Sequence, residues 1–350
     1  MRRHRVAVIA GDGIGVEVVP PALRVLERLA QRGGFTIEFT EFPWSCAYYL
    51  AHGVMMPADG FETLKTFDAI FLGAIGDPRV VPDHISLHGL LLPIRQRFDL
   101  YVNLRPSRTF AGIPTPLKGD PQFDIAVVRE NTEGEYAGMG GRLRAGTADE
   151  VALQTTIFTR KGVERIARYA FELARKRNKR LTSATKSNAQ QFVFVMWDEV
   201  IAAVAAEYPD IELRRFHVDA LTAALVRNPS QFDVIVASNL FGDILTDLTG
   251  ALQGSLGIPA SANLNPERQF PSLFEPVHGS APDIAGRGIA NPIATLWAAS
   301  MMLDFLGEVD SAAKLLAALE ANLAEEKIRT ADIGGSATTA QVIADIYERL

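Results

Sequence analysis

The chain has 350 residues, which is enough for two ordinary domains or one large α/β unit. Hydrophobic residues make up 48% and charged residues 22%, so the composition is globular and excludes disorder, collagen and coiled coil. The 41 acidic and 35 basic residues leave a formal net charge of −6, which favours neither nucleic acid nor an anionic membrane as a partner.

The compartment and membrane signals are few. The single cysteine, Cys46, excludes an intrachain disulfide and a cysteine-rich zinc site, and it favours a reducing, cytoplasmic location. The apolar run Val6–Ala10 after the basic first residues is too short for the core of a signal peptide. The longest later apolar stretch, Ile293–Leu303, has about half the length that a bilayer requires. We therefore expect a soluble protein with no membrane span.

Short apolar runs alternate with segments of helical periodicity along most of the chain, which predicts an α/β fold with a mostly parallel core sheet. Strands are predicted at Val6–Ala10, Phe35–Phe42, Phe67–Gly73, Phe123–Val128, Leu181–Ala184, Ile211–Val218 and Phe232–Ala237. Helices are predicted at Glu17–Leu29, Arg160–Arg177 with Thr159 as its cap, Asn188–Glu207, Asp219–Arg227, Leu240–Leu252, Pro292–Leu306, Ser311–Glu326 and Ala337–Leu350.

Two stretches rich in proline and glycine, Phe110–Pro121 and Gly254–Pro276, are the candidate hinges. Their placement suggests a middle domain inserted between the two halves of an outer one.

The first glycine-rich turn is Gly11-Asp12-Gly13-Ile14-Gly15, between a predicted strand and a predicted helix. Its third glycine falls one residue early for the dinucleotide-binding pattern G-x-G-x-x-G. The acids Glu38 and Glu41 lie within an alternating strand, so they do not supply the acidic residue that such folds place at a strand end. A tight turn and a ligand loop remain equally open, and a classical Rossmann fold is not predicted.

Three aspartates follow predicted strands, where α/β sheets place their ligands. Asp243 and Asp247 are four residues apart on one helix, so both carboxylates project from one face and repel each other unless a cation lies between them. Asp219 opens another helix. Taken singly, each has an ordinary structural explanation as a helix-start residue or a solvated acid. Together they predict an oxygen-rich site suited to Mg²⁺ or Mn²⁺.

Three arginines occupy rigid positions. Arg129 ends a buried strand, Arg105 lies between Leu104 and a proline, and Arg95 follows Pro93-Ile94. For any one of them, pairing with a surface acid is the default explanation. Beside a metal-type set of acids, however, three guanidinium groups indicate a substrate with two carboxylates.

Two further residues could transfer protons. Lys186 follows the predicted strand Leu181–Ala184, and Tyr136 follows Glu133-Gly134-Glu135. A divalent cation and several arginines would lower the pKa of a lysine toward the range useful for catalysis. The alternative is a solvated lysine and an amphipathic surface tyrosine.

The polar, glycine-containing segment from Glu275 to Gly286, which is followed by Asn291-Pro292, is too long for a mere connection and predicts a binding loop. His278 could stack on a base, and Asp283 could accept hydrogen bonds from ribose hydroxyls.

Together these motifs resemble the β-decarboxylating dehydrogenases, the family of isocitrate, isopropylmalate and tartrate or D-malate dehydrogenases. The resemblance spans essentially the whole chain, and within the family the tartrate/D-malate branch is the most similar. The motifs occur in the family's order: Gly11–Gly15, Asn103–Pro106, Arg129–Tyr136, Thr185–Asn188, Ser238–Asp247 and Glu275–Asp283.

The resemblance implies two α/β domains around one large, mixed, mostly parallel sheet, with residues 1–102 and 256–350 in the outer domain and residues 103–255 inserted. It also implies a homodimer with shared active sites. An arm near residues 137–157 would join the subunits, and Lys186 and Asp219 would reach into the other subunit's site.

The resemblance assigns roles to individual residues. A divalent cation, Mg²⁺ or Mn²⁺, would be held by Asp243, Asp247 and the other subunit's Asp219, and a monovalent cation such as K⁺ is left open. The dicarboxylate substrate would contact Arg95, Arg105, Arg129, His88 and Leu91. The cofactor NAD would contact Glu275, His278, Gly279, Ser280, Ala281, Pro282, Asp283, Ile284, Asn291 and Asn188. Lys186, Tyr136 and Asp219 would be the catalytic residues.

Two positions bear on specificity. Asp283, which is followed by Ile284, stands where relatives that use NADP carry a lysine, and a carboxylate repels a 2′-phosphate, which favours NAD⁺. Isopropylmalate enzymes usually carry glutamate at the position of His88, and isocitrate enzymes carry serine near Gly89. Neither pattern is met, which leaves oxidation of D-malate to pyruvate and CO₂, oxidation of tartrate, or both.

Two alternatives remain. The leucines before Arg95 are compatible with isopropylmalate as the substrate. A non-catalytic regulatory subunit is the alternative of another class, although such subunits tend to lose the acids or the lysine that this chain retains.

Overall fold

The computed structural model describes residues 2–350, which divide into two compact units. Of the described residues, the first unit contains 2–100, 108–120 and 250–350, and the second contains 101–107 and 121–249. Residues 108–120 and 250–255, placed in the inserted part from the sequence, thus belong to the first unit, and residues 101–102, placed in the outer part, belong to the second. Within residues 2–350, no helix is long and apolar enough to cross a membrane.

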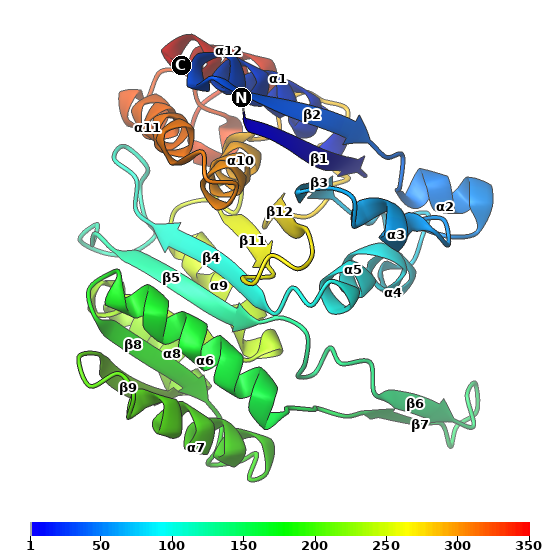
Figure 1. Cartoon of the computed structure of the whole chain (residues 1–350), viewed down its shortest axis with the longest axis vertical. Coiled ribbons are helices and arrows are strands. Elements are labelled where there is room, and N and C mark those ends of the chain that lie inside the picture. The colour runs from blue at the N-terminus through cyan, green and yellow to red at the C-terminus, as the bar shows by residue number, and fades with distance from the viewer. Residues whose placement is uncertain (1) are drawn as a thin grey trace. The chain divides into compact units, whose positions relative to one another are not determined.

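Ten strands form a mixed, mostly parallel sheet, and each unit supplies five of them (Figure 1). In the first unit the order is β2-β1-β3-β12-β11. Parallel pairing joins β1 to β2 and β3, and β3 to β12, whereas β11 and β12 are antiparallel. These strands are β1 (Arg2–Gly11), β2 (Phe35–Glu41), β3 (Ala69–Ala74), β11 (Ala260–Leu264) and β12 (Ser272–Pro276).

In the second unit the strand order is β4-β5-β10-β8-β9. Parallel pairing joins β10 to β5 and β8, and β8 to β9. The carboxyl ends of these strands therefore lie at one edge, where α/β sheets gather functional side chains. The strands are β4 (Val102–Arg108), β5 (Asp124–Glu130), β8 (Arg180–Thr185), β9 (Glu212–His217) and β10 (Val234–Ala237).

Helices cover the strands of the first unit. The helix α10 is buried along nearly its whole length and packs on β12 and α11, while α1 packs on β2, β3 and α12. The long helices are α1 (Gly15–Gly33), α10 (Ile293–Phe305), α11 (Val309–Glu325) and α12 (Thr339–Arg349). The shorter ones are α2 (Cys46–His52), α3 (Gly60–Leu64), α4 (Asp83–Ser86), one π-helical turn (Leu87–Leu91), α5 (Leu92–Arg97) and a 3₁₀ turn (Ala331–Ile333).

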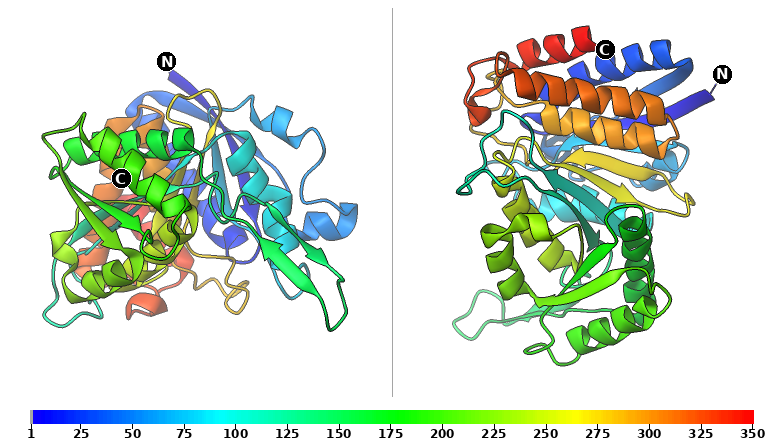
Figure 2. Two further views of the ribbon diagram at one scale, coloured as in Figure 1. Left: turned by 90° about the horizontal axis from the view of Figure 1, so that it is seen from below. Right: turned by 90° about the vertical axis from the view of Figure 1, so that its left-hand side faces the viewer.

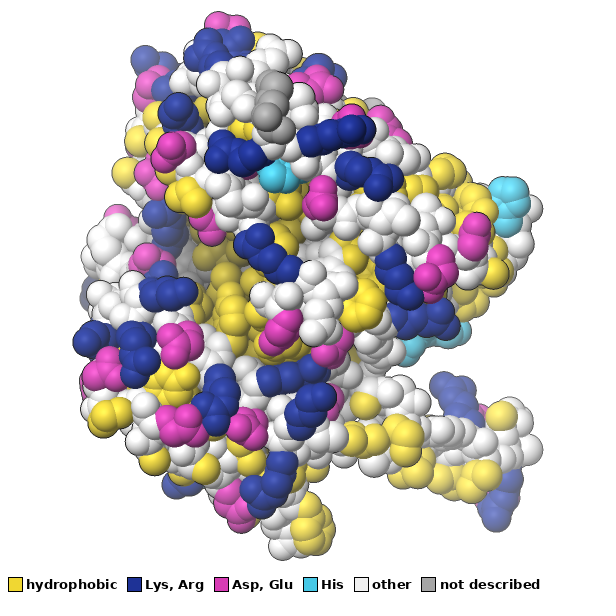
Figure 3. Space-filling view, viewed as in Figure 1, with side chains coloured by type: hydrophobic (Ala, Val, Ile, Leu, Met, Phe, Trp, Pro, Cys, Tyr) yellow, Lys and Arg dark blue, Asp and Glu magenta, His cyan; other side chains and the backbone are white. Residues whose placement is uncertain are grey.

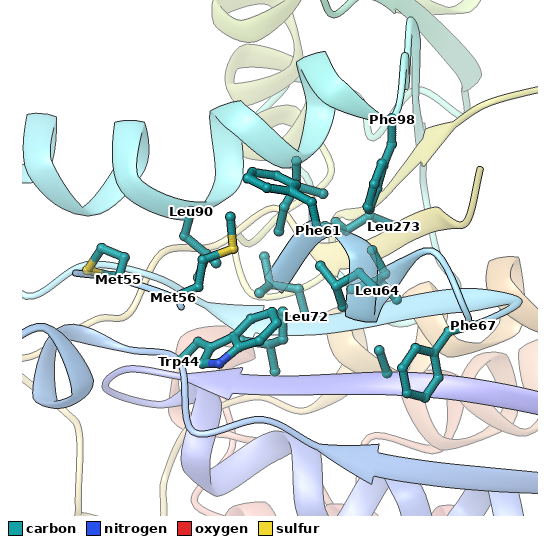
Figure 4. Packing of buried hydrophobic residues seen from close by; sticks show 14 of the residues in the cluster. Trp44, Met55, Met56, Phe61, Leu64, Phe67, Leu72, Leu90, Phe98 and Leu273 are labelled. Atoms are coloured by element: carbon teal, nitrogen blue, oxygen red, sulfur yellow. The ribbon is translucent and has the colours of Figure 1, made fainter. Parts of the chain in front are cut away.

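A hydrophobic cluster supports the short helices of this unit (Figure 4). Phe61 of α3 and Phe98, which follows α5, pack edge to face with ring centroids 6.0 Å apart. Leu90 of the π-helical turn, Leu72 of β3 and Leu273 of β12 belong to the same buried cluster. This packing fixes the segment that carries His88, Leu91 and Arg95.

In the second unit, α6 and α7 pack against each other, and a two-stranded antiparallel hairpin extends from the segment before α6 (Figure 2). The Thr159 side chain caps α6 by accepting a hydrogen bond from the Gly162 N–H at 2.9 Å, as expected from the sequence. The elements are α6 (Arg160–Arg175), α7 (Val193–Ala205), α8 (Val218–Arg227), a 3₁₀ turn (Pro229–Gln231), α9 (Asn239–Leu252), β6 (Gly140–Leu143) and β7 (Val151–Gln154).

Two predictions of local structure are wrong. The helix expected from Asn188 begins at Val193, because the intervening residues form turns. The expected hinge Gly254–Pro276 contains β11 and β12, and every residue of both strands is buried. The sequence misled because both strands are short, carry polar residues and are bounded by prolines. It also gave no signal for β4, whose centre contains Arg105 and Pro106.

Candidate active site

The guanidinium group of Arg129 is held at the end of β5 by the start of α9. The Arg129 residue is only 1% exposed, and its Nε and Nη2 donate to the Asn239 side-chain oxygen at 3.0 and 2.7 Å. The helix passes close to the arginine stem, because a Cβ at Gly242 would lie 2.6 Å from Arg129 Cβ and Cγ. Glycine at this position is therefore needed for the close approach.

Three side chains predicted to act at the site contact the Asp243 carboxylate. Its Oδ1 pairs with Nη1 of Arg129 and lies 3.4 Å from Nη1 of Arg105. The Tyr136 hydroxyl donates to Oδ2 at 3.2 Å. Arg105 Nη1 also donates to the Thr246 hydroxyl at 2.7 Å, one turn further along α9. The structure thus brings together Arg105, Arg129, Tyr136 and Asp243 as one charged cluster.

Asp247 lies one turn beyond Asp243 on α9. Burial raises the pKa of the Asp247 carboxyl and the charge of Asp243 raises it further, whereas Arg105 and Arg129 lower it. Two neighbouring carboxylates that repel in this way supply hard oxygen ligands for a divalent cation. Across residues 2–350, no three His, Cys, Asp or Glu side chains gather closely enough to hold a metal. The pair therefore offers part of a coordination shell.

Tyr136 belongs to a loop that is fastened to the same asparagine. The Asn239 amide donates to the Glu133 carbonyl at 3.0 Å, while its oxygen receives Arg129. Burial raises the pKa of the Tyr136 phenol, Asp243 adds to this effect, and Arg129 opposes it. The phenol is therefore protonated at neutral pH, as a proton donor must be.

Glu130, next to Arg129, is a buried acid that sequence reasoning missed. Its carboxylate accepts hydrogen bonds from the Thr132 N–H at 3.0 Å, the Thr132 hydroxyl at 2.8 Å and the Glu133 N–H at 2.8 Å. Burial raises its pKa to about 7 despite these bonds. Glu130 fixes the first residues of the Tyr136 loop. Its position two residues after the apolar pair Val127-Val128 was the available signal.

Lys186 and Asp219 form a separate pair in this unit. Lys186 follows β8 and donates to Asp219 Oδ1 at 2.5 Å, and Asp219 lies in the first turn of α8. This hydrogen bond lowers the pKa of the Asp219 carboxyl. The Asp219 side chain is 68% exposed, so it remains accessible to other partners. Asn188, predicted to contact the cofactor, lies exposed in the turn after Lys186.

In the first unit, Arg95 and Glu275 bind each other. Arg95 Nη2 donates to Glu275 Oε1 at 2.8 Å, and the same oxygen accepts from the Asn263 amide at 2.8 Å. The side chains of Arg95 and Glu275 are 7% and 8% exposed. One was predicted to bind substrate and the other cofactor, whereas here they neutralise each other at the ends of α5 and β12.

The glycine-rich turn after β1 is a structural junction. The Asp12 carboxylate accepts from the Cys46 N–H and the Gly76 N–H, both at 2.9 Å, so one acid ties three segments together. Gly13 has φ +55°, and a Cβ there would lie 2.0 Å from the Ser280 carbonyl oxygen. The Ile14 N–H donates to that same oxygen at 2.8 Å. The turn thus supports the loop that carries His278 and Ser280.

The residues of this loop that were predicted to contact the cofactor differ in burial and in hydrogen bonding. Burial lowers the pKa of His278, so its imidazole is neutral at neutral pH. Its Nδ1 lies 3.0 Å from the Gly279 carbonyl oxygen, and its Nε2 is buried without a hydrogen-bond partner among residues 2–350. Asp283 is exposed. Asn291 is committed internally, because its oxygen accepts from the Ile293 N–H at 3.0 Å and its amide donates to Asp332 at 2.9 Å. The other predicted residues of this loop are Gly279, Ala281, Pro282 and Ile284.

A family model described as isocitrate/isopropylmalate dehydrogenase matches residues 5–346. The chain belongs to this family of oxidoreductases. A solved isocitrate dehydrogenase from Methylococcus capsulatus superposes with a TM-score of 0.89 at 36% identity and covers 99% of both chains. The predicted isopropylmalate-dehydrogenase-like fold is confirmed, which is not a classical Rossmann fold.

Two curated relatives are more similar in sequence. A probable tartrate dehydrogenase/decarboxylase of Bacillus subtilis (strain 168) is 54% identical, with 100% of this chain and 99% of the relative aligned. A D-malate dehydrogenase [decarboxylating] of Escherichia coli (strain K12) is 56% identical, with 98% and 97% aligned. The similarity expected with the tartrate/D-malate branch is confirmed.

Proposed function

We propose that the protein is an NAD⁺- and divalent-metal-dependent dehydrogenase that oxidises a four-carbon 2-hydroxy diacid, converting D-malate to pyruvate and CO₂, oxidising tartrate, or both. The names of the relatives at 54% and 56% identity support the substrate class. The observation that carries the proposal is the cluster in which Arg105, Arg129 and Tyr136 all contact Asp243.

Asp243 and Asp247 fit a divalent cation, because their mutual repulsion is relieved when a cation binds. Asp219 is proposed as a third ligand from a second copy of the chain, a role that rests on the family resemblance. When bound, Mg²⁺ or Mn²⁺ acts as a Lewis acid on the substrate hydroxyl and the adjacent carboxylate, and NAD⁺ acts as the oxidant. A monovalent cation such as K⁺ is a further proposal of the resemblance alone.

The chain's own side chains are proposed to bind the substrate carboxylates and to transfer protons. Arg105 and Arg129 bind carboxylate oxygens in place of Asp243, and Arg95 has the same proposed role. Lys186, released from its pairing with Asp219 and in its neutral amine form, would accept the proton of the C2 hydroxyl as this carbon is oxidised. Once the C3–carboxylate bond has broken and CO₂ has left, Tyr136 donates its phenolic proton to C3.

The loop of residues 276–292 is proposed to bind NAD⁺. The neutral imidazole of His278 suits contact with an adenine base, and the exposed Asp283 suits ribose hydroxyls. Arg79 lies near Asp283, but its Nε and Nη2 donate to Asp77 at 2.8 and 2.7 Å, and its Nη1 donates to the Pro282 carbonyl at 3.2 Å. A 2′-phosphate would therefore meet the Asp283 carboxylate beside an arginine whose N–H groups are already engaged, which disfavours NADP.

Substrate choice is proposed to depend on the π-helical turn that carries His88, which is exposed, and Leu91, which is half-buried. Isocitrate is disfavoured because the turn leaves no room for a serine at position 89. A Cβ at Gly89 would lie 2.6 Å from Met55 Cγ. Isopropylmalate is the second candidate, because Leu91 and its neighbours offer an apolar surface to a branched alkyl group.

A homodimer is proposed, joined through the β6–β7 hairpin. Met139, Leu143, Val151 and Leu153 are each more than half exposed, with Leu143 at 68% and Leu153 at 65%. Figure 3 shows hydrophobic side chains along this hairpin. Exposed apolar side chains on a projecting hairpin favour burial against a partner.

A cytoplasmic location is also proposed, which agrees with Cys46 being buried and reduced.

The test is a substrate panel. Purified protein with Mn²⁺ and NAD⁺ is mixed in turn with D-malate, the tartrate isomers, 3-isopropylmalate and isocitrate, and NADH formation is followed. We expect the highest kcat/KM with D-malate or a tartrate, and one pyruvate and one CO₂ for each NADH formed from D-malate. NADP⁺ and a Lys186→Met protein serve as controls. Faster oxidation of isopropylmalate would select the second candidate, and no NADH with any acid would favour a regulatory subunit.

A further inference from the structure

A groove of about 810 Å³ lies between α1 and α12 in the first unit. The two helices lie side by side in Figures 1 and 2. The groove is bordered by residues of one stripe of α1, one stripe of α12 and the loop at Arg287. Apart from Arg287 and Gly288, which belong to the loop proposed to bind NAD⁺, none of these residues has been assigned a role above.

Three arginines border the groove without an acidic partner. Arg24, Arg28 and Arg287 form no ion pair within residues 2–350. Arg28 stacks on Tyr347, with its Cζ 4.2 Å from the ring centroid, and its Nε is buried without a hydrogen-bond partner. A buried guanidinium N–H without an acceptor is costly, so an acceptor supplied by a ligand would be favourable here.

The rest of the groove suits a flat apolar group. Pro21, Ile343, Ala344 and Tyr347 supply apolar surface between the helices. Glu27 and Glu348 also border the groove and would repel a ligand anion, so the anion must lie beside the arginines. A third acid, Glu17, is already occupied by backbone N–H groups.

The groove adjoins the loop proposed to bind NAD⁺. The Glu17 carboxylate accepts the Gly286 N–H and, at 2.9 Å, the Gly288 N–H. On the other side, the Thr339 N–H donates to the Gly288 carbonyl at 2.9 Å, and the Thr339 hydroxyl donates to the Ala290 carbonyl at 2.6 Å. Both helices therefore hold the segment that contains Arg287, and a ligand bound to Arg287 would hold it further.

We propose that this groove binds a small anion, such as a phosphate, sulfate or carboxylate, that carries a flat apolar group. The anion contacts Arg24, Arg28 and Arg287, and the apolar group lies against Tyr347 and Ile343. Binding restrains the Arg287 segment and so raises the affinity of the adjoining loop for NAD⁺, a second effect that rests on the proposed function.

The probe is phenyl phosphate, with inorganic phosphate and phenol as its two halves. Each is titrated calorimetrically into the full-length protein, with and without saturating NAD⁺. We expect saturable binding of phenyl phosphate, tighter than that of either half. Arg24→Ala and Arg287→Ala should each weaken it about tenfold, as expected for one lost charge-assisted hydrogen bond. Arg214→Ala, which removes the same charge in the second unit, should leave binding unchanged.

The site is refuted if wild-type protein shows no saturable binding, or if the Arg24 and Arg287 variants bind as wild type does. Unfolding transitions of the variants are compared first, because both arginines are exposed and their removal should leave the fold intact. The second effect is read from the Kd for NAD⁺ with and without phenyl phosphate. An unchanged Kd, or no NAD⁺ binding at all, overturns the coupling, whereas the titration without NAD⁺ still decides whether the site exists.

Discussion

Asn239 holds Arg129 with one end of its amide and the Tyr136 loop with the other. Its oxygen accepts two N–H groups of Arg129, at 3.0 and 2.7 Å, and its amide donates to the Glu133 carbonyl at 3.0 Å. Because Asn239 is 2% exposed, water cannot easily replace either contact. A single buried side chain thus positions a proposed substrate ligand and a proposed proton donor.

Replacing Asn239 should separate these two functions. Asn239→Ala removes the acceptor of a buried guanidinium, so the KM for the diacid should rise about tenfold or more, with kcat also reduced. Asn239→Asp keeps an acceptor for Arg129 but loses the bond to Glu133. It should therefore lower kcat and shift the pH profile assigned to Tyr136. Steady-state kinetics at several pH values measure both effects, and kinetics like wild type in both variants would remove Asn239 from this role.

Lys186 is expected to be essential for proton removal. Lys186→Met keeps the length of the side chain but has no basic nitrogen, so kcat should fall by roughly 10²–10⁴. The fluorescence titration of NADH binding should be nearly unchanged. Lys179→Met is a matched control, because Lys179 is also paired with an aspartate, at 3.5 Å, in the same unit. Near-normal turnover in Lys186→Met would exclude the lysine as the base.

Asp247 should contribute directly to metal affinity. Asp247→Asn removes one charged oxygen ligand, so binding of Mn²⁺, measured by titration, should weaken at least about tenfold. Because burial and Asp243 raise the pKa of Asp247, wild-type affinity should fall as the pH is lowered through that raised pKa. The exposed Asp304 supplies the control Asp304→Asn. Equal Mn²⁺ affinity in Asp247→Asn and wild type would contradict the assignment.

Glu130 should make stability depend on pH. Its pKa is raised to about 7 in the folded chain from 4.5, so the folded state binds the proton more tightly than the unfolded state does. Its contribution to the free energy of unfolding is therefore retained below about pH 4.5 and lost as the pH rises to about 7. The loss is on the order of a few kcal/mol.

Glu130→Gln removes this titration. Urea unfolding at pH 5 and pH 8 should show that the variant gains stability relative to wild type at the higher pH, although it also loses one acceptor for the Thr132 and Glu133 N–H groups. Glu150→Gln, in the exposed hairpin, is the control. If the difference between Glu130→Gln and wild type is the same at both pH values, Glu130 ionises in the folded chain as it does in the unfolded one.

Much of the fold could be predicted because periodicity reports burial. The strand predicted at Phe35–Phe42 is β2, which lies at the edge of the sheet, and its residues alternate in exposure as the sequence pattern required. Strands β11 and β12 could not be predicted, because strands buried on both faces normally read as apolar runs. Here the buried polar residues Asn263 and Glu275 bind each other, and Glu275 also binds Arg95, which lies 180 positions away.

The candidate site was partly predictable for a related reason. Aspartates and arginines at strand ends are visible in the sequence, and Arg105, Arg129, Tyr136 and Asp243 do meet. The contacts that hold them are not visible, because Asn239, Thr246 and Gly242 act through distances set by tertiary packing. The pairing of Arg95 with Glu275 likewise joins residues 180 positions apart.

The Arg95–Glu275 pair has a consequence for ligand affinity. A guanidinium withdrawn from water needs a counter-charge at all times, and here the protein's own carboxylate provides one when no substrate is near. If Arg95 binds the substrate as proposed, an incoming diacid must displace the Glu275 carboxylate from it. The free energy that the diacid gains at Arg95 would then be the difference between its own ion pair and the Arg95–Glu275 pair. Such a small difference would let the product dissociate readily.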